Sequence, residues 1–263
     1  MAQSQPVSPT LAAETLPAIR KITLGDLWDA LAKGIDDFKA MPTHAIFLVA
    51  IYPVIGLFLA RATMDSALLP LLYPLIGGFA LVGPLAAIGL YEMSRRREKG
   101  LDAVAAHAFD IFKSPAIIPI LELGAILMAL FFVWLAVARS LYGWAFSGAR
   151  PASFEHMVQA VLTTQEGLAL IIAGNVVGAV FAALAFALTA VSFPLLLDRH
   201  VSLSVAVGTS VRAVLANPAV MAIWAFLIAA ALFIGALPLF VGLIVVLPVL
   251  GHASWHVYRK VVA

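Results

Sequence analysis

The segment from Pro74 to Arg96 reads PLIGGFALVGPLAAIGLYEMSRR, and the segment from Pro238 to Lys260 reads PLFVGLIVVLPVLGHASWHVYRK. Laid over each other without a gap, both segments start with a proline, have a second proline ten residues later, and end in an aromatic residue followed by basic residues. The identical positions are Pro74/Pro238, Leu75/Leu239, Gly78/Gly242, Val82/Val246, Pro84/Pro248 and Arg95/Arg259. Two copies of one apolar segment predict a multi-pass membrane protein built from repeats.

The composition agrees with this class. Hydrophobic residues make up 63% of the 263 residues and charged residues 11%, and the mean hydropathy is +1.04. A soluble domain is about half apolar and about a quarter charged. The chain has no cysteine, which excludes disulfides and thiolate metal sites. Its basic residues gather at the ends of apolar segments and form no separate basic patch, so no nucleic-acid partner is expected.

Polar and proline-rich residues at the N-terminus predict a disordered tail over residues 1–21, without the features of a signal peptide. From Ile22 to Ala40, apolar residues recur at helical spacing and charged residues fill the other positions, which predicts an amphipathic helix. This helix either packs on the protein's own surface or binds lipid or a partner. Residues 101–113 and 203–215 predict two further amphipathic helices.

Six apolar segments predict six membrane-spanning helices. They cover about residues 45–60, 67–91, 115–138, 168–197, 219–236 and 237–255. The fourth is longer than a perpendicular helix needs, so a tilt or a break near Pro194 is expected. The sequence therefore predicts an all-α membrane protein in which residues 22–263 form a single six-span domain. Its three repeat units, each an amphipathic helix, a proline junction and a hairpin, cover about 22–91, 101–197 and 203–258.

The basic residues predict the orientation. Of the 16 lysines and arginines, Arg61, Arg139 and Arg150 fall on one side of the predicted membrane, and the other thirteen fall on the opposite side. Because lysine and arginine accumulate on the cytoplasmic side of inner-membrane proteins, both termini and all three amphipathic helices are expected in the cytoplasm.

His252 and His256 are four residues apart, so they share one helix face and form a candidate metal or haem site. Alternatively, they are polar anchors at the cytoplasmic interface. The two copies of the repeated segment differ here, at Ile88/His252 and Glu92/His256, which marks this face as a place to look for function. No catalytic motif and no other cofactor motif occurs, so neither an enzyme nor a bound cofactor is predicted.

Two polar residues lie inside predicted spans. Glu122 either pairs with a neighbouring polar group, such as Asn217 or His252, or takes part in ion or proton movement. Asn175 lies beside glycines, where a hydrogen bond between helices or contact with a substrate would explain it. The run Arg95, Arg96 and Arg97 could bind anionic lipid head groups, although orientation alone explains it. These residues leave a small transporter or channel as an alternative function.

Three segments resemble bacterial integral membrane proteins grouped as domain of unknown function 2189. The segments read YPLIGGFALVGPLAAIGLYEMSRRREKG (73–100), FPLLLDRHVSLSVAVGTSVRAVLANPAVMAIW (193–224) and HASWHVYRK (252–260). Members are sometimes labelled as cytochrome c oxidase subunits. The resemblance implies a multi-pass protein of the bacterial inner membrane. A haem-copper catalytic subunit needs several histidines buried in its spans, so the expected role is that of a non-enzymatic accessory, assembly or scaffold protein for a membrane complex, or a lipid organiser. Its expected partners are membrane lipid and another membrane protein or further copies of the chain.

Overall fold

The computed structural model describes residues 16–42, 87–148, 151–238 and 240–263, together with scattered positions between 49 and 84. Those positions are 49, 53, 56–57, 61, 69–71, 73–75, 77–78 and 83–84. Within these residues the protein is helical and has no β-strand, which confirms the all-α class. The first two predicted spans, about 45–60 and 67–91, lie largely outside the described residues.

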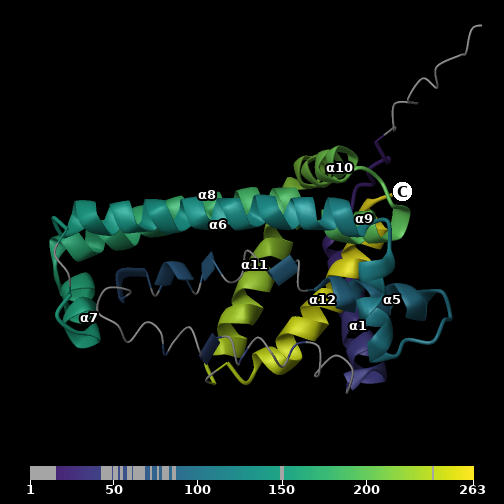
Figure 1. Ribbon diagram of the computed structural model, residues 1–263, viewed down its shortest axis with the longest axis horizontal. Helices are drawn as coiled ribbons and strands as arrows, with labels where there is room; N and C mark the ends of the chain where they lie inside the picture. Colours follow the sequence, from purple (N-terminus) through teal and green to yellow (C-terminus); the bar gives the residue numbers. More distant parts are fainter. Residues whose placement is uncertain are drawn as a thin grey trace, which may run out of the picture.

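One end of the molecule, here called the head, contains most of the tightly packed core (Figure 1). Its elements are α1 (Leu24–Ala40), α5 (Ile88–Glu98), the 3₁₀ helix η2 (Ala105–Lys113), α9 (Ser192–Arg199), α10 (Leu203–Ala216) and α12 (Leu243–Val261). Thr23 and Asp26 form a capping box at the start of α1. A Cβ atom at Gly34 would lie 2.6 Å from the backbone nitrogen of Ala253, so this glycine lets α1 lie directly on α12.

Both described ends of the chain meet in the head. Residues 16–21 lie outside the helices, and Ile19 forms an antiparallel bridge with Val262. The side chain of Asn217 accepts a hydrogen bond from the backbone nitrogen of Ile22 at 2.9 Å and donates to the carbonyl of Arg20 at 3.1 Å. The last residues of the predicted tail are therefore held against the head, while residues 1–15 lie outside the described part.

The second part of the molecule, here called the arm, is the antiparallel pair of α6 (Ile117–Ala145) and α8 (Gln165–Thr189). Figure 1 shows the arm running away from the head, with α7 (Phe154–Thr163) at its outer end. Trp134 of α6 packs against Gly178 and Phe181 of α8. The helix is interrupted at residues 190–191, between α8 and α9, and Pro194 is the third residue of α9. This agrees with the break expected near Pro194 in the predicted fourth span.

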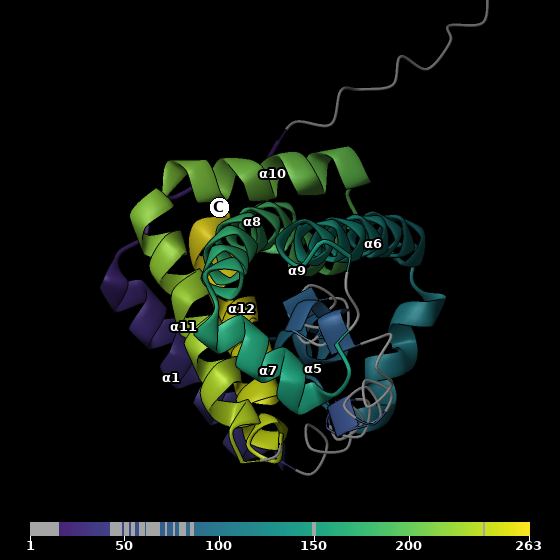
Figure 2. The same ribbon diagram turned by 90° about the vertical axis from the view of Figure 1, so that its left-hand side faces the viewer.

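Six spans are not confirmed. Among the described residues, three stretches are long and apolar enough to cross a membrane: α6, α8 with α9, and α11 (Pro218–Ala236). Figures 1 and 2 show α11 and α12 lying across the arm instead of along it. The sixth span was expected over residues 237–255, but the helix observed there, α12, begins six residues later. Pro238 interrupts the helix and Phe240 has a positive φ of 66°, so α12 begins at Leu243 and continues to Val261 inside the head.

The threefold repeat is not confirmed either. The second amphipathic unit, expected over 101–113, is a 3₁₀ helix that begins only at Ala105. Ala30 and Ala206, each twelve residues before the proline of its junction (Pro42 and Pro218), are fully buried. Their counterpart Ala103 is only partly buried and precedes η2. The second unit therefore differs in geometry from the first and the third.

Candidate functional site: a buried polar cluster in the head

Five polar side chains from three helices meet inside the head, and we call them the head cluster. They are Asp37 of α1, Ser94 and Arg97 of α5, and His252 and His256 of α12. Asp37 is 3% exposed, Ser94 1% and His252 0%. Buried polar groups are costly unless they are hydrogen-bonded, so the internal contacts of the cluster decide whether it stabilises the head.

Asp37 is the centre of the head cluster. Its Oδ2 accepts a hydrogen bond from the Ser94 hydroxyl at 2.6 Å and lies 2.9 Å from Nε2 of His256. Its Oδ1 accepts a hydrogen bond from Arg97, which also bonds Asp36 at 2.9 Å. Burial by itself raises the pKa of Asp37, but the hydrogen bonds from His256, Ser94 and Arg97 outweigh it and lower the pKa to about 2. Asp37 is therefore a carboxylate at neutral pH.

His252 continues the cluster inward. Its Nδ1 lies 2.7 Å from the Ser94 oxygen. Because the Ser94 proton is donated to Asp37, Nδ1 of His252 must carry the proton of this contact, which leaves Nε2 as an acceptor. Nε2 is buried and has no hydrogen-bond partner in the described part of the chain.

The geometry of Ser94 differs from that of an activated nucleophile. A catalytic serine donates its proton to a histidine and faces an open cleft. Ser94 donates to a carboxylate instead, and it is buried. The hydrogen bonds of the head cluster join α1, α5 and α12, so its evident effect is to fix these three helices against one another.

The geometry gives the metal hypothesis for His252 and His256 no support. Nε2 of His256 contacts Asp37, and Nδ1 of His252 contacts Ser94. Across the described residues, no group of three histidine, aspartate or glutamate side chains is arranged to hold a metal ion. The metal site therefore stays a hypothesis for chemical analysis.

The three predicted lipid-binding arginines lie in the last turn of α5, and each contacts a protein group. Arg95 forms an ion pair with Glu92 at 2.8 Å. Arg96 donates a hydrogen bond to the carbonyl of Asp102 at 2.6 Å, and Arg97 bonds Asp36 and Asp37. The SRRR run was expected after the end of a span, but it continues the helix, and its positive charge interacts favourably with the C-terminal end of the helix dipole.

Glu122 and Asn175 do not come together. Glu122 is the sixth residue of α6, and its side chain is exposed instead of pairing with Asn217 or His252. Asn175 accepts a hydrogen bond from the Tyr73 hydroxyl at 2.9 Å, a contact between segments of the kind expected for it. Because Gly178 packs on Trp134 and the two helices are antiparallel, Asn175 is level with residue 137 of α6. Glu122 is 15 residues from that position, or roughly 22 Å at 1.5 Å per residue. A single transport path through both has no support in this arrangement.

Sequence patterns alone do not single out Asp37 or Ser94 as members of a site. Asp37 lies among the charged residues of the amphipathic helix predicted over residues 22–40, and Ser94 follows the predicted second span, 67–91. One signal could have placed Asp37: Ala30, Gly34 and Asp37 follow one another at four and three residues, so they share a helix face with two small residues. Small residues on one face indicate close helix packing, which buries whatever polar group lies on the same face.

The fold, with three apolar helices long enough to cross a membrane, defines an integral membrane protein. Residues 72–198 match the model of the family described as "Predicted integral membrane protein (DUF2189)", which confirms the resemblance over that part of the chain. No curated protein and no solved structure matches the chain. The matched segment includes Ser94 and Arg97, whereas Asp37, His252 and His256 lie outside it.

Proposed function

We propose that this protein is a non-enzymatic subunit or assembly factor of a larger membrane complex, which it binds through the outer surface of its arm. The head stabilises the base of the arm, and the arm provides the contact surface. The proposal rests on one observation, the exposed carboxyl group of Glu122 on an apolar helix face.

The surface of the arm favours contact with another helix. On α8, large apolar side chains are exposed at every fourth position, and each is about half exposed or more. They are Leu168, Ile172, Val176, Val180 and Leu184. Such an i, i+4 row forms a ridge that fits the groove of a neighbouring helix. Lipid can also cover an apolar ridge, so the ridge does not by itself indicate a protein partner.

Glu122 distinguishes a protein partner from lipid. Its exposed neighbours on α6 include Ile118, Leu121 and Ile126. An ionisable group among lipid-facing side chains costs several kcal/mol unless it is paired. In the described part of the chain, Glu122 forms no hydrogen bond or ion pair with another side chain. A spanning helix of a second protein that carries a hydrogen-bond donor at this depth would remove that cost.

The orientation and location form part of the same proposal. Lysines and arginines gather in α1, α5 and α12 of the head, whereas Arg139 is at the outer end of α6. This distribution favours a head on the cytoplasmic side of the bacterial inner membrane.

Native mass spectrometry of the full chain, purified in mild detergent from its own cells, tests the proposal. We expect a stoichiometric complex with a second membrane protein for the wild type, a weakened complex for Glu122→Gln and its loss for Glu122→Leu. Glu155→Gln, which changes an exposed carboxylate on α7, is the matched control and should leave the complex intact. A wild-type monomer, an assembly of copies of this chain alone, or a complex unaffected by Glu122→Leu would contradict the proposal.

A further inference from the structure

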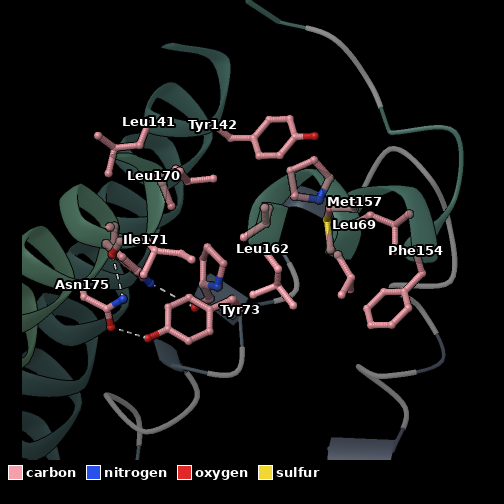
Figure 3. A pocket seen from close by; sticks show the side chains of 17 residues that line it. Leu69, Tyr73, Leu141, Tyr142, Phe154, Met157, Leu162, Leu170, Ile171 and Asn175 are labelled. Atoms are coloured by element: carbon pink, nitrogen blue, oxygen red, sulfur yellow. Dashed lines mark hydrogen bonds between the residues drawn. The ribbon is translucent and has the colours of Figure 1, made fainter. Parts of the chain in front are cut away.

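A partly open cavity of about 500 Å³ lies at the outer end of the arm, lined by residues of α6, α7, α8 and the short 3₁₀ helix η1 (Leu69–Leu71) (Figure 3). Its volume is within the range of roughly 300–1,000 Å³ that is usual for small-ligand sites. The walls are almost entirely apolar, and Leu141, Met157, Leu162 and Ile171 are among the side chains that form them.

A few neutral polar groups face this cavity. The Tyr73 hydroxyl donates a hydrogen bond to Oδ1 of Asn175, and Nδ2 of Asn175 donates one of its two hydrogens to the carbonyl of Ile171 at 2.8 Å. The second hydrogen on Nδ2 remains available. Tyr142 of α6 also lines the cavity, and its hydroxyl has no hydrogen-bond partner among the described residues (Figure 3). The cavity therefore offers hydrogen-bond donors but no charged side chain.

We propose that this cavity binds one hydrocarbon chain of a membrane phospholipid, whose ester carbonyl accepts a hydrogen bond from Asn175 or Tyr142. The apolar walls match the chain, and the neutral donors match an uncharged carbonyl oxygen. A free fatty acid fits less well, because its ionised carboxylate would meet no cation in the lining. Tyr142 and Trp144 lie near the end of α6, where aromatic residues mark the interface between membrane and water, at the depth of lipid esters.

Local sequence keeps the cavity open. Gly174 lines it, and a Cβ atom at this position would have no neighbour within 4 Å. A larger residue here would therefore enter empty space. At Gly167 a Cβ atom would lie 2.2 Å from the carbonyl oxygen of Val161, so only glycine lets α7 turn back tightly onto α8 and form one wall. Glu122 does not line this cavity, so the lipid site does not depend on the proposed partner contact.

Photochemical labelling tests the lipid site. The full chain is reconstituted into phosphatidylcholine vesicles in which a small fraction of the lipid carries a diazirine on one acyl chain, and the labelled peptides are mapped after irradiation. We expect labelling in α7 and in the first half of α8. Gly174→Leu should lower it at least fivefold by filling the cavity. Gly143→Leu, at another helical glycine with no neighbour within 4 Å and outside the cavity, should leave it unchanged.

Two further measurements keep the test decisive. Asn175→Val removes the donor without filling the cavity and should lower labelling about threefold, so the proposal can still be tested if Gly174→Leu fails to fold. A diazirine fatty acid in the same vesicles should label these peptides more weakly than the phospholipid. Equal labelling of the wild type and a folded Gly174→Leu variant would overturn the site, and equal or stronger labelling by the fatty acid would overturn ester recognition.

Discussion

Replacement of Asp37 by alanine should lower the free energy of unfolding by roughly 3–5 kcal/mol, the usual cost of removing one partner from a buried ion pair. Asp37 is 3% exposed and bonds Ser94, His256 and Arg97. The buried Ser94 hydroxyl would lose its acceptor, which costs about 1–3 kcal/mol. The loss of the bond to Arg97 contributes less to this cost, because Arg97 is partly exposed and still forms its ion pair with Asp36. The remaining cost comes from His256 and from the space left by the carboxylate.

Thermal unfolding in detergent, followed by tryptophan fluorescence, measures this effect. Trp255 donates a hydrogen bond to Glu98 at the contact between α12 and α5, so it reports on the head. For a chain of this size, about 2–4 °C is lost per kcal/mol, which predicts a fall of roughly 10 °C. The matched control is Asp36→Ala, because the Asp36 side chain is 68% exposed and should contribute less than about 1 kcal/mol. If the two variants unfold at the same temperature, the head cluster does not hold α1, α5 and α12 together.

Four further outcomes follow from the structure. Folding lowers the pKa of Asp37 from 3.8 to about 2, so the stabilising effect of its carboxylate is complete above about pH 4 and is lost as the pH falls towards 2. The difference in unfolding temperature between wild type and Asp37→Ala should therefore be constant near neutrality and shrink below pH 4. Gly34→Val should separate α1 from α12, seen as faster amide hydrogen exchange in α1. Gly167→Ala should displace α7 and reduce lipid labelling of the cavity. Metal analysis and an absorption spectrum of pure protein should show no stoichiometric metal or haem; a metal that disappears in His252→Ala and His256→Ala would contradict their hydrogen-bonded arrangement.

Local signals predicted several helices well. The periodic segment 203–215 corresponds to α10 (Leu203–Ala216), and the apolar segment 219–236 to α11 (Pro218–Ala236). Asn217 and Pro218 mark the boundary between them, because proline is favoured at the first position of a helix and disfavoured in its interior. Such signals act over a few residues, so a single sequence is enough to read them.

The head cluster depends on contacts between residues far apart in the sequence, so local patterns do not predict it. Asp37 is 57 residues from Ser94 and 219 residues from His256. Helical periodicity assigned Asp37 to a solvated face because most carboxylates in such patterns are exposed. What overrides this preference is the close approach of α12 at Gly34, and no periodicity within α1 carries that information. The same limit applies to α6 and α8, since their hydropathy does not tell whether lipid, this chain or another protein covers them.

The two similar segments, 74–96 and 238–260, contribute to the head through different contacts. Their helical parts, α5 and α12, pack on each other, with Gly251 in the middle of α12 against Leu90 in the first turn of α5. In α5, Arg95 pairs with Glu92 of its own helix. The equivalent Arg259 of α12 instead pairs with Glu98 of α5 and Asp198 of α9, and His256, the equivalent of Glu92, contacts Asp37 of α1. The charged side chains Glu92 and Arg95 of the first segment thus pair with each other. Those of the second segment pair with groups on three neighbouring helices. Arg259 and His256 together therefore link α12 to α5, α9 and α1.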